Sequence, residues 1–202
     1  MRYFYFILCL FFVSPQLLAQ SKWQEDTHYK VIAEQASSSP QVREVFSYWC
    51  PACNAFETLV PQIKQGLPAN VPFRKVHVNF NGSTNKATQD AATAAMLAAK
   101  ALKVSENFNK TLFTAIHQQR KKLSSKADIL AIYAEAGGDT AKLEKMMNSF
   151  GIRSQIAQND KLTTGVRSVP TVIVNDKFQP IFTRIMKPEE YIELINWLLK
   201  QK

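Results

Sequence analysis

Two cysteines separated by two residues, Cys50 and Cys53, are the side chains of this sequence best suited to covalent chemistry. They stand in the run VFSYWCPACNAF, where a segment rich in β-branched and aromatic residues is followed by a helical pattern. A cysteine at the start of a helix lies beside unpaired backbone N–H groups, which favour a thiolate. We therefore predict that Cys50 is a nucleophile. Pro51 suits the first helical turn, because it has no N–H group to leave unpaired there.

The two cysteines are expected to have different roles. Cys50, at the exposed helix tip, forms a mixed disulfide with another protein, and Cys53, one turn deeper on the same face, is the resolving or leaving thiol. A disulfide between them closes almost no loop, so a purely structural bridge would add little stability. Half of a zinc site is the other alternative. It needs two further ligands, and His28, His77 and His117 lack the required spacing, so we predict no metal.

The first 19 residues have the pattern of a secretory signal. Arg2 is their only charge, an apolar run follows it, and Leu17-Leu18-Ala19 ends the segment. The apolar run has about 11 residues, against the ~20 that a membrane-spanning helix needs. Cleavage after Ala19 is therefore predicted over an uncleaved anchor. Cleavage removes Cys9 and leaves the C-x-x-C pair as the cysteines of an exported chain, in a compartment where disulfides persist.

Composition and charge exclude some classes of protein. The chain has 202 residues, of which 46% are hydrophobic and 20% charged, so it can form one packed domain or a domain with one large insertion. The formal net charge is +9, and +9 minus the charge of Arg2 leaves +8 after cleavage. The cations are scattered, and the short run Arg120-Lys121-Lys122 lies at the predicted end of a helix, where the helix dipole favours cations. We predict no nucleic-acid partner.

The elements that must position the cysteines alternate between strand and helix patterns. A strand leads directly into Cys50, and the helix that follows it contains Pro61, which predicts a kink. Glycines at 137, 138 and 151 stand where helix ends are expected. The predicted elements are, in order, a strand at 41–49, a helix at 50–67, a strand at 71–80, helices at 84–103, 106–120, 126–136, 140–150 and 154–164, strands at 171–175 and 177–182, and a helix at 187–199.

This order predicts an α/β fold in which a sheet sandwich is interrupted by an inserted, all-helical domain. The predicted organisation is a signal peptide at 1–19, the first part of the sheet domain at 20–81, the helical insertion at 82–156 and the second part of the sheet domain at 157–202.

Four further positions are candidates for a role beside the cysteines. Glu44 lies in an otherwise apolar strand, where burial would raise its pKa and suit it to proton exchange with a thiol; a strand-edge glutamate in water is the alternative. Lys75 lies in the second strand, where its ammonium group can also reach water. Val169-Pro170 directly precedes a strand, a common place for a cis peptide bond, although a trans proline opening an edge strand fits the same pattern. His77 is interpreted as a structural strand histidine.

Together these segments resemble the DsbA family of periplasmic disulfide oxidases. The runs PQVREVFSYWCPAC, KVHVNFNG, NSFGIRSQIAQ and GVRSVPTVIVNDKF match family segments in order, and the resemblance covers essentially the whole chain after the signal. It implies a thioredoxin-like domain with a helical insertion. It also implies that Cys50 is the nucleophile and Cys53 the buried cysteine. The further roles that it implies are a cis-proline loop that binds the substrate backbone, at Val169 and Pro170, and a buried charged pair beneath the second cysteine, at Glu44 and Lys75.

The resemblance also implies a function. The chain would be an exported, periplasmic thiol–disulfide oxidoreductase that donates the Cys50–Cys53 disulfide to unfolded or reduced exported proteins. It would need no cofactor beyond that disulfide, and a membrane partner of the DsbB type would re-oxidise it. The short segment before the first predicted strand leaves no room for the dimerisation domain of exported isomerases, so a monomer is predicted.

Ala52 stands where many family members have a histidine. Without that histidine the thiolate of Cys50 loses a favourable neighbour, so a milder oxidant is predicted. A periplasmic reductase or isomerase, and a peptide-binding module of the chaperone type, remain alternative functions.

Overall fold

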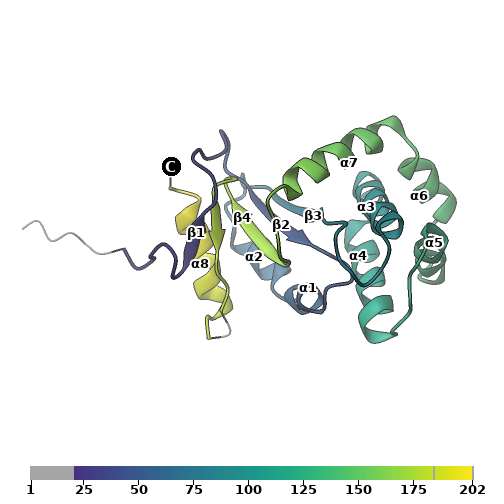
Figure 1. Ribbon diagram of the computed structural model, residues 1–202, viewed down its shortest axis with the longest axis horizontal. Helices are drawn as coiled ribbons and strands as arrows, with labels where there is room; N and C mark the ends of the chain where they lie inside the picture. Colours follow the sequence, from purple (N-terminus) through teal and green to yellow (C-terminus); the bar gives the residue numbers. More distant parts are fainter. Residues whose placement is uncertain (1–20, 184, 202) are drawn as a thin grey trace, which may run out of the picture.

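The computed structural model describes residues 21–183 and 185–201, so the predicted signal peptide lies outside the described residues. A five-stranded sheet runs in the order β1-β5-β4-β2-β3 (Figure 1). β2 (Val42–Phe46) is parallel to β3 (Phe73–His77) and antiparallel to β4 (Thr171–Val174), and β4 is antiparallel to β5 (Phe178–Pro180). β1 (Tyr29–Val31) pairs with β5 at one edge. β2 is thus an inner strand, and all five of its residues are buried.

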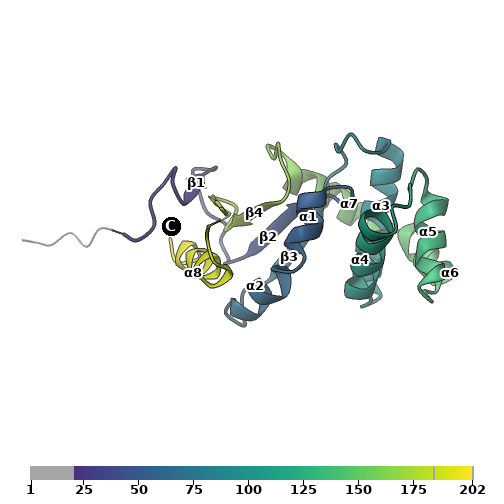
Figure 2. The same ribbon diagram turned by 90° about the horizontal axis from the view of Figure 1, so that it is seen from below.

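Helices cover both faces of the sheet. α1 (Pro51–Phe56), α2 (Val60–Gly66) and α8 (Pro188–Leu198) pack on one face, and Figure 2 shows α2 and α8 side by side there. α7 (Phe150–Thr163) packs on the other face, against β3. The residues of inner strands β2 and β4 that point to the first face are Val42, Val172 and Val174, and those that point to the second are Val45 and Ile173. This layering gives the strand that leads to the cysteines a rigid base.

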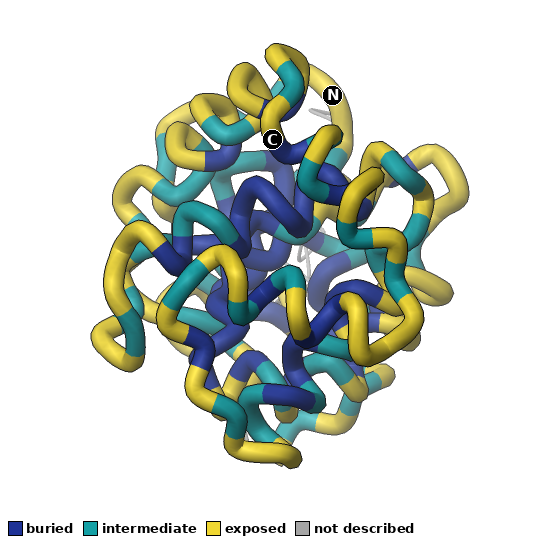
Figure 3. Tube along the Cα trace, turned by 90° about the vertical axis from the view of Figure 1, so that its right-hand side faces the viewer, coloured by how far each residue is buried: buried dark blue, intermediate teal, exposed yellow. Residues whose placement is uncertain are grey.

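A helical domain is inserted between β3 and α7. Its small alanine side chains let the helices approach closely, and Ala92, Ala95, Ala98 and Ala99 are fully buried. Its core is continuous with Phe46 at the end of β2, and Figure 3 shows the buried segments at the centre of this side of the molecule. The inserted elements are α3 (Lys86–Ala101), α4 (Ser105–Phe113), the π-helix η1 (Thr114–Gln118), α5 (Lys126–Glu135) and α6 (Thr140–Met147).

The predicted α/β fold with a helical insertion is confirmed, two local predictions are wrong, and one strand was not predicted. The kinked helix is two helices, because Pro61 lies in the first turn of α2, where its missing N–H costs nothing. Gly151 does not end a helix: α7 begins at Phe150, and the Ser149 hydroxyl accepts the Ile152 N–H at 3.3 Å as its N-cap. β1 was not predicted, because a three-residue strand is too short to show a periodic pattern.

The predicted end of the insertion, between residues 156 and 157, falls inside α7. This helix runs without a break from the helical domain back to the sheet (Figure 1).

Candidate redox site

Cys50 is the N-cap residue of α1. Its backbone is extended, with φ −92° and ψ 116°, and its Sγ accepts the N–H of Cys53 at 3.3 Å. The side chain therefore takes the position in which an oxygen-bearing residue normally caps a helix. Both cysteines are free thiols in this structure. The prediction that a helix begins just after Cys50 is confirmed, whereas β2 ends at Phe46 and a turn at 47–49 separates it from Cys50.

The loop before β4 lies against Cys50. The Val169–Pro170 peptide bond is cis, as predicted, and the Cys50 thiol donates to the Val169 carbonyl oxygen at 3.4 Å. The exposed fraction of Cys50 is only 8%, and Cys53 has no exposed surface. The expectation of a freely exposed sulfur at the helix tip is thus wrong, because the proline loop covers part of it. Of the two sulfurs, Cys50 is the one that an incoming molecule can reach.

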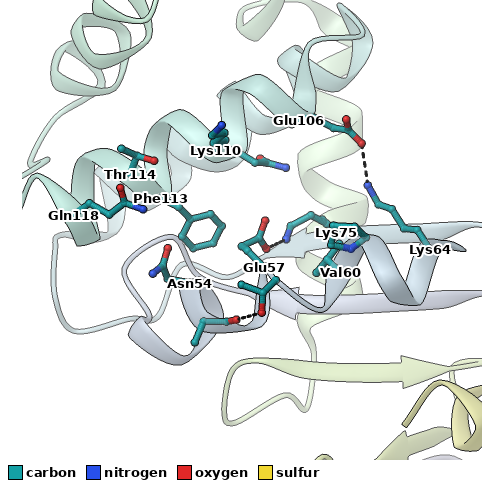
Figure 4. Close-up of a pocket in the computed structure, with 14 residues that line it drawn as sticks. Asn54, Glu57, Val60, Lys64, Lys75, Glu106, Lys110, Phe113, Thr114 and Gln118 are labelled. Carbon is teal, nitrogen blue, oxygen red and sulfur yellow. Dashed lines mark hydrogen bonds and ion pairs between the residues drawn. The ribbon is translucent and has the colours of Figure 1, made fainter. Parts of the chain in front are cut away.

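A buried cluster of charges lies beneath the cysteines. The parallel register of β2 and β3 places Glu44 opposite Lys75, and the Lys75 Nζ lies 2.9 Å from the Glu44 Oε2. Glu57, at the end of α1, also contacts Lys75, as Figure 4 shows. Glu44 has no exposed surface, so the alternative of a strand-edge glutamate in water is wrong. Burial raises the pKa of Glu44, the Lys75 charge partly offsets this, and Glu57 adds to it.

Cys53 is held in its neutral form by the same surroundings. Burial raises the pKa of Cys53 far above its ordinary value, the negative charges of Cys50 and Glu44 add to the rise, and a hydrogen bond with the Ser47 backbone opposes it. Two chemically identical thiols, three residues apart, are therefore in different environments: Cys50 caps a helix and is 8% exposed, and Cys53 is fully enclosed in the apolar core.

Glu57 and His117 are two residues of this site that the sequence analysis missed. Glu57 follows Cys53 by four residues, so helical spacing alone places it on the same face as that thiol. His117 lies in the π-helix, and its Nε2 is 2.8 Å from the carbonyl oxygen of Tyr48 in the loop that leads to Cys50. No local signal predicts this contact, because it depends on how the insertion packs against that loop.

His77 is structural, as interpreted from the sequence. Its Nδ1 lies 2.9 Å from the Thr93 hydroxyl, and burial lowers its pKa to about 3, so the ring is neutral at physiological pH.

Two cavities lie near the cysteines. The larger, of about 590 Å³, separates α1 and α2 from α4 and the π-helix, and Lys75 and Glu57 line it together with Lys110 and Phe113 (Figure 4). The second, of about 390 Å³, begins at the proline loop. We call it the proline groove, and its lining residues are Lys30, Phe56, Pro170, Thr171, Val172, Gln179, Pro180, Ile181, Phe182 and Tyr191.

Within residues 21–183 and 185–201, no three histidine, cysteine or acidic side chains are grouped so that they could bind a metal ion. In the same part of the chain, no helix has the length and apolar character needed to cross a membrane.

The geometry of the site agrees with the comparison of the chain with known protein families. Residues 41–187 match the model of the DSBA-like thioredoxin domain. The chain belongs to the DsbA family. The thiol:disulfide interchange protein DsbA of Escherichia coli strain K12 is 31% identical over 164 residues, which cover 79% of this chain and 77% of that protein. DsbA of Pseudomonas aeruginosa strain PAO1 is 31% identical over 164 residues, covering 80% of this chain and 75% of its own.

Solved DsbA structures share the fold. DsbA of Proteus mirabilis superposes with a TM-score of 0.78 at 25% identity, over 89% of this chain and 98% of that one. DsbA of Pseudomonas aeruginosa superposes with a TM-score of 0.72 at 28% identity, over 86% of this chain and 91% of that one. The Proteus mirabilis protein has also been solved with a non-covalently bound peptide, PWATCDS, and that structure superposes with a TM-score of 0.77.

This DsbA-family chain is therefore a disulfide-donating thiol:disulfide oxidoreductase with a thioredoxin-like fold, and its family works through a redox-active disulfide.

Proposed function

We propose that this protein donates the Cys50–Cys53 disulfide to newly exported proteins in the periplasm, and that Cys50 is the sulfur which their thiolates attack. One observation carries the assignment of roles. Cys50 is the N-cap residue of α1 and keeps 8% of its surface exposed, while Cys53 is wholly buried behind it. The helix amides favour negative charge on Cys50, which makes it the better leaving group when the mixed disulfide is resolved.

The proposed reaction has two thiol–disulfide exchanges. A substrate thiolate attacks the Cys50 Sγ, the bond between the two enzyme sulfurs breaks, and Cys53 leaves as a thiolate that takes up a proton. A second substrate thiolate then attacks the substrate sulfur of the mixed disulfide, and Cys50 leaves as a thiolate. The substrate loses two electrons and gains a disulfide, and the enzyme gains both electrons and becomes a dithiol.

Glu44 and Lys75 are proposed to serve the first exchange. Cys53 leaves as an anion into a site that favours its neutral form, so it needs a proton. Burial raises the pKa of Glu44 above that of an ordinary glutamate, so this carboxyl group is the proposed partner for proton exchange with Cys53, and Lys75 and Glu57 connect it to the larger cavity.

Val169 and Pro170 are proposed to bind the substrate chain beside Cys50. The Val169 carbonyl oxygen already accepts a bond from the Cys50 thiol, and the proline groove starts next to it. The peptide bound non-covalently to the Proteus mirabilis relative supports peptide segments as ligands of this site.

The setting of the reaction is also proposed. Residues 1–19 are a cleaved signal peptide, the parts of the thioredoxin-like domain are 20–81 and 157–202 around the insertion at 82–156, and the protein acts as a monomer. A DsbB-type membrane oxidase restores the disulfide. Ala52, between the cysteines, makes the pair a milder oxidant than relatives with a histidine there.

Trapping distinguishes this proposal from a peptide-binding module, and transfer of a disulfide to a reduced protein distinguishes it from a reductase. Cys53→Ala, expressed in cells with its signal intact, should accumulate mixed disulfides through Cys50 with exported proteins and with its recycling partner. Cys50→Ser should trap none and should fail to oxidise a reduced model protein. A Cys50→Ser variant that retained the activity would overturn the assignment, and so would a purified oxidised protein that transfers no disulfide.

A further inference from the structure

The proline groove has aromatic walls and runs away from the cysteines. Phe56, Phe182 and Tyr191 meet in mostly edge-on contacts, with ring centroids 4.9–6.4 Å apart. Phe182 is 44% exposed, so the groove keeps an open apolar wall. Such a wall accepts many side chains and by itself gives little selectivity.

The far end of the groove is cationic. Lys30 is an exposed residue of the edge strand β1, and it pairs in register with Gln179 of β5, which also lines the groove. Among the described residues, Lys30 forms no ion pair, whereas Lys22 and Lys64 each lie within 4.0 Å of a carboxylate. The groove therefore ends in a positive charge that no described carboxylate of the protein neutralises.

We propose that Lys30 selects substrate segments that carry an acidic side chain close to the cysteine being oxidised. This rests on the proposed function of the site. From β4, which follows Pro170, the sheet passes through β5 to β1, so the backbone of Lys30 lies two strand spacings, or about 10 Å, across the sheet from β4, and Lys30 and Pro170 line the same groove. An extended peptide advances about 3.3 Å per residue. An Asp or Glu about three residues from the attacking cysteine then reaches the Lys30 ammonium group.

A competition assay measures this preference directly. Pairs of reduced dithiol peptides, identical except for Asp or Lys three residues from the attacking cysteine, are mixed with limiting oxidised protein and quantified by mass spectrometry after an acid quench. One series places the test residue before the cysteine and another after it. In one of the two series the wild-type protein should oxidise the Asp peptide about three- to tenfold faster than the Lys peptide. This range corresponds to the attraction between an exposed lysine and Asp, compared with the repulsion between the same lysine and Lys. The ratio should approach one in 1 M salt, where screening acts within about 3 Å.

Two variants separate a local effect from general charge attraction. Lys30→Glu should reverse the preference and Lys30→Gln should abolish it. Lys145→Glu changes the net charge of the protein by the same amount as Lys30→Glu does. Lys145 is an exposed residue of α6 in the helical domain, so this variant should keep the wild-type ratio.

Equal rates for both peptides in both series, or a ratio that Lys145→Glu changes as much as Lys30→Glu does, would overturn the role of Lys30. The enzyme would still oxidise both peptides in that case. If the wild-type protein oxidised neither peptide, the proposed function itself would fail.

Discussion

Replacing Lys75 by Met isolates the energetics of the buried charge cluster. The Glu44 side chain has no exposed surface, its Oε1 has no hydrogen-bond partner, and Lys75 supplies the partner of its Oε2. Lys75→Met keeps most of the side-chain volume but leaves a buried carboxylate without a counter-charge. Removing one member of such a pair typically costs about 3–5 kcal/mol of unfolding free energy. For Lys75→Met we expect a loss of about 3 kcal/mol of unfolding free energy at pH 7. This is the lower end of that range, because Glu44 can take up a proton when its counter-charge is removed.

The pH dependence of this loss follows from the sign of the Glu44 shift. The folded-state pKa of Glu44 lies above the ordinary value of 4.5, because burial outweighs the attraction of Lys75. A carboxyl group with a raised folded pKa contributes stability at low pH and loses it as the pH rises through that folded value. Without Lys75 the pKa rises further. The deficit of the variant should therefore grow once the pH exceeds the folded pKa of Glu44 in the wild type, by up to about 1.4 kcal/mol per pH unit, and should be smaller at pH 5 than at pH 7.

Urea unfolding of the reduced protein at pH 5 and pH 7 measures the loss of unfolding free energy and its dependence on pH. Glu44→Gln combined with Lys75→Met removes both charges and should recover most of the loss at pH 7. Lys126→Met is the matched control, because its ion pair with Glu144 is exposed and should contribute at most about 1 kcal/mol. The reasoning is refuted if Lys75→Met unfolds within 1 kcal/mol of the wild type at pH 7. A deficit of the same size at both pH values would refute it as well.

Three further predictions concern the residues around the two sulfurs. Ala52→His should shift the redox equilibrium with glutathione toward the reduced enzyme, and an unchanged equilibrium would contradict the role given to position 52. In the reduced protein at pH 8, iodoacetamide should alkylate Cys50 and leave Cys53 unmodified, because burial raises the pKa of Cys53; peptide mapping that found both modified equally would contradict this. His117→Leu should lose about 1 kcal/mol of unfolding free energy with the hydrogen bond to the Tyr48 carbonyl, and an unchanged urea midpoint would show that this contact is not stabilising.

The sequence by itself determined the features that depend on neighbours along the chain. The cysteine at the start of a helix, a few residues after a strand, is such a feature, and so is the Val169–Pro170 pair before a strand, because turn and capping preferences act over a few residues. The order of strands and helices, and therefore the fold class, was predicted for the same reason. Some errors arose where local signals compete, such as the helix predicted to kink at Pro61 and found divided into two.

Only the tertiary structure decided the features that join distant segments. Glu44 and Lys75 are 31 residues apart and meet because β2 and β3 align in parallel register, which also determined that the carboxyl group is buried rather than in water. The contact between His117 and Tyr48 spans 69 residues, and it required the packing of the helical insertion. Lys30 reaches the proline groove through a three-residue strand with no periodic signal. Pairings of this kind depend on the global arrangement of the chain, because their energy comes from burial and charge contacts that no local pattern encodes.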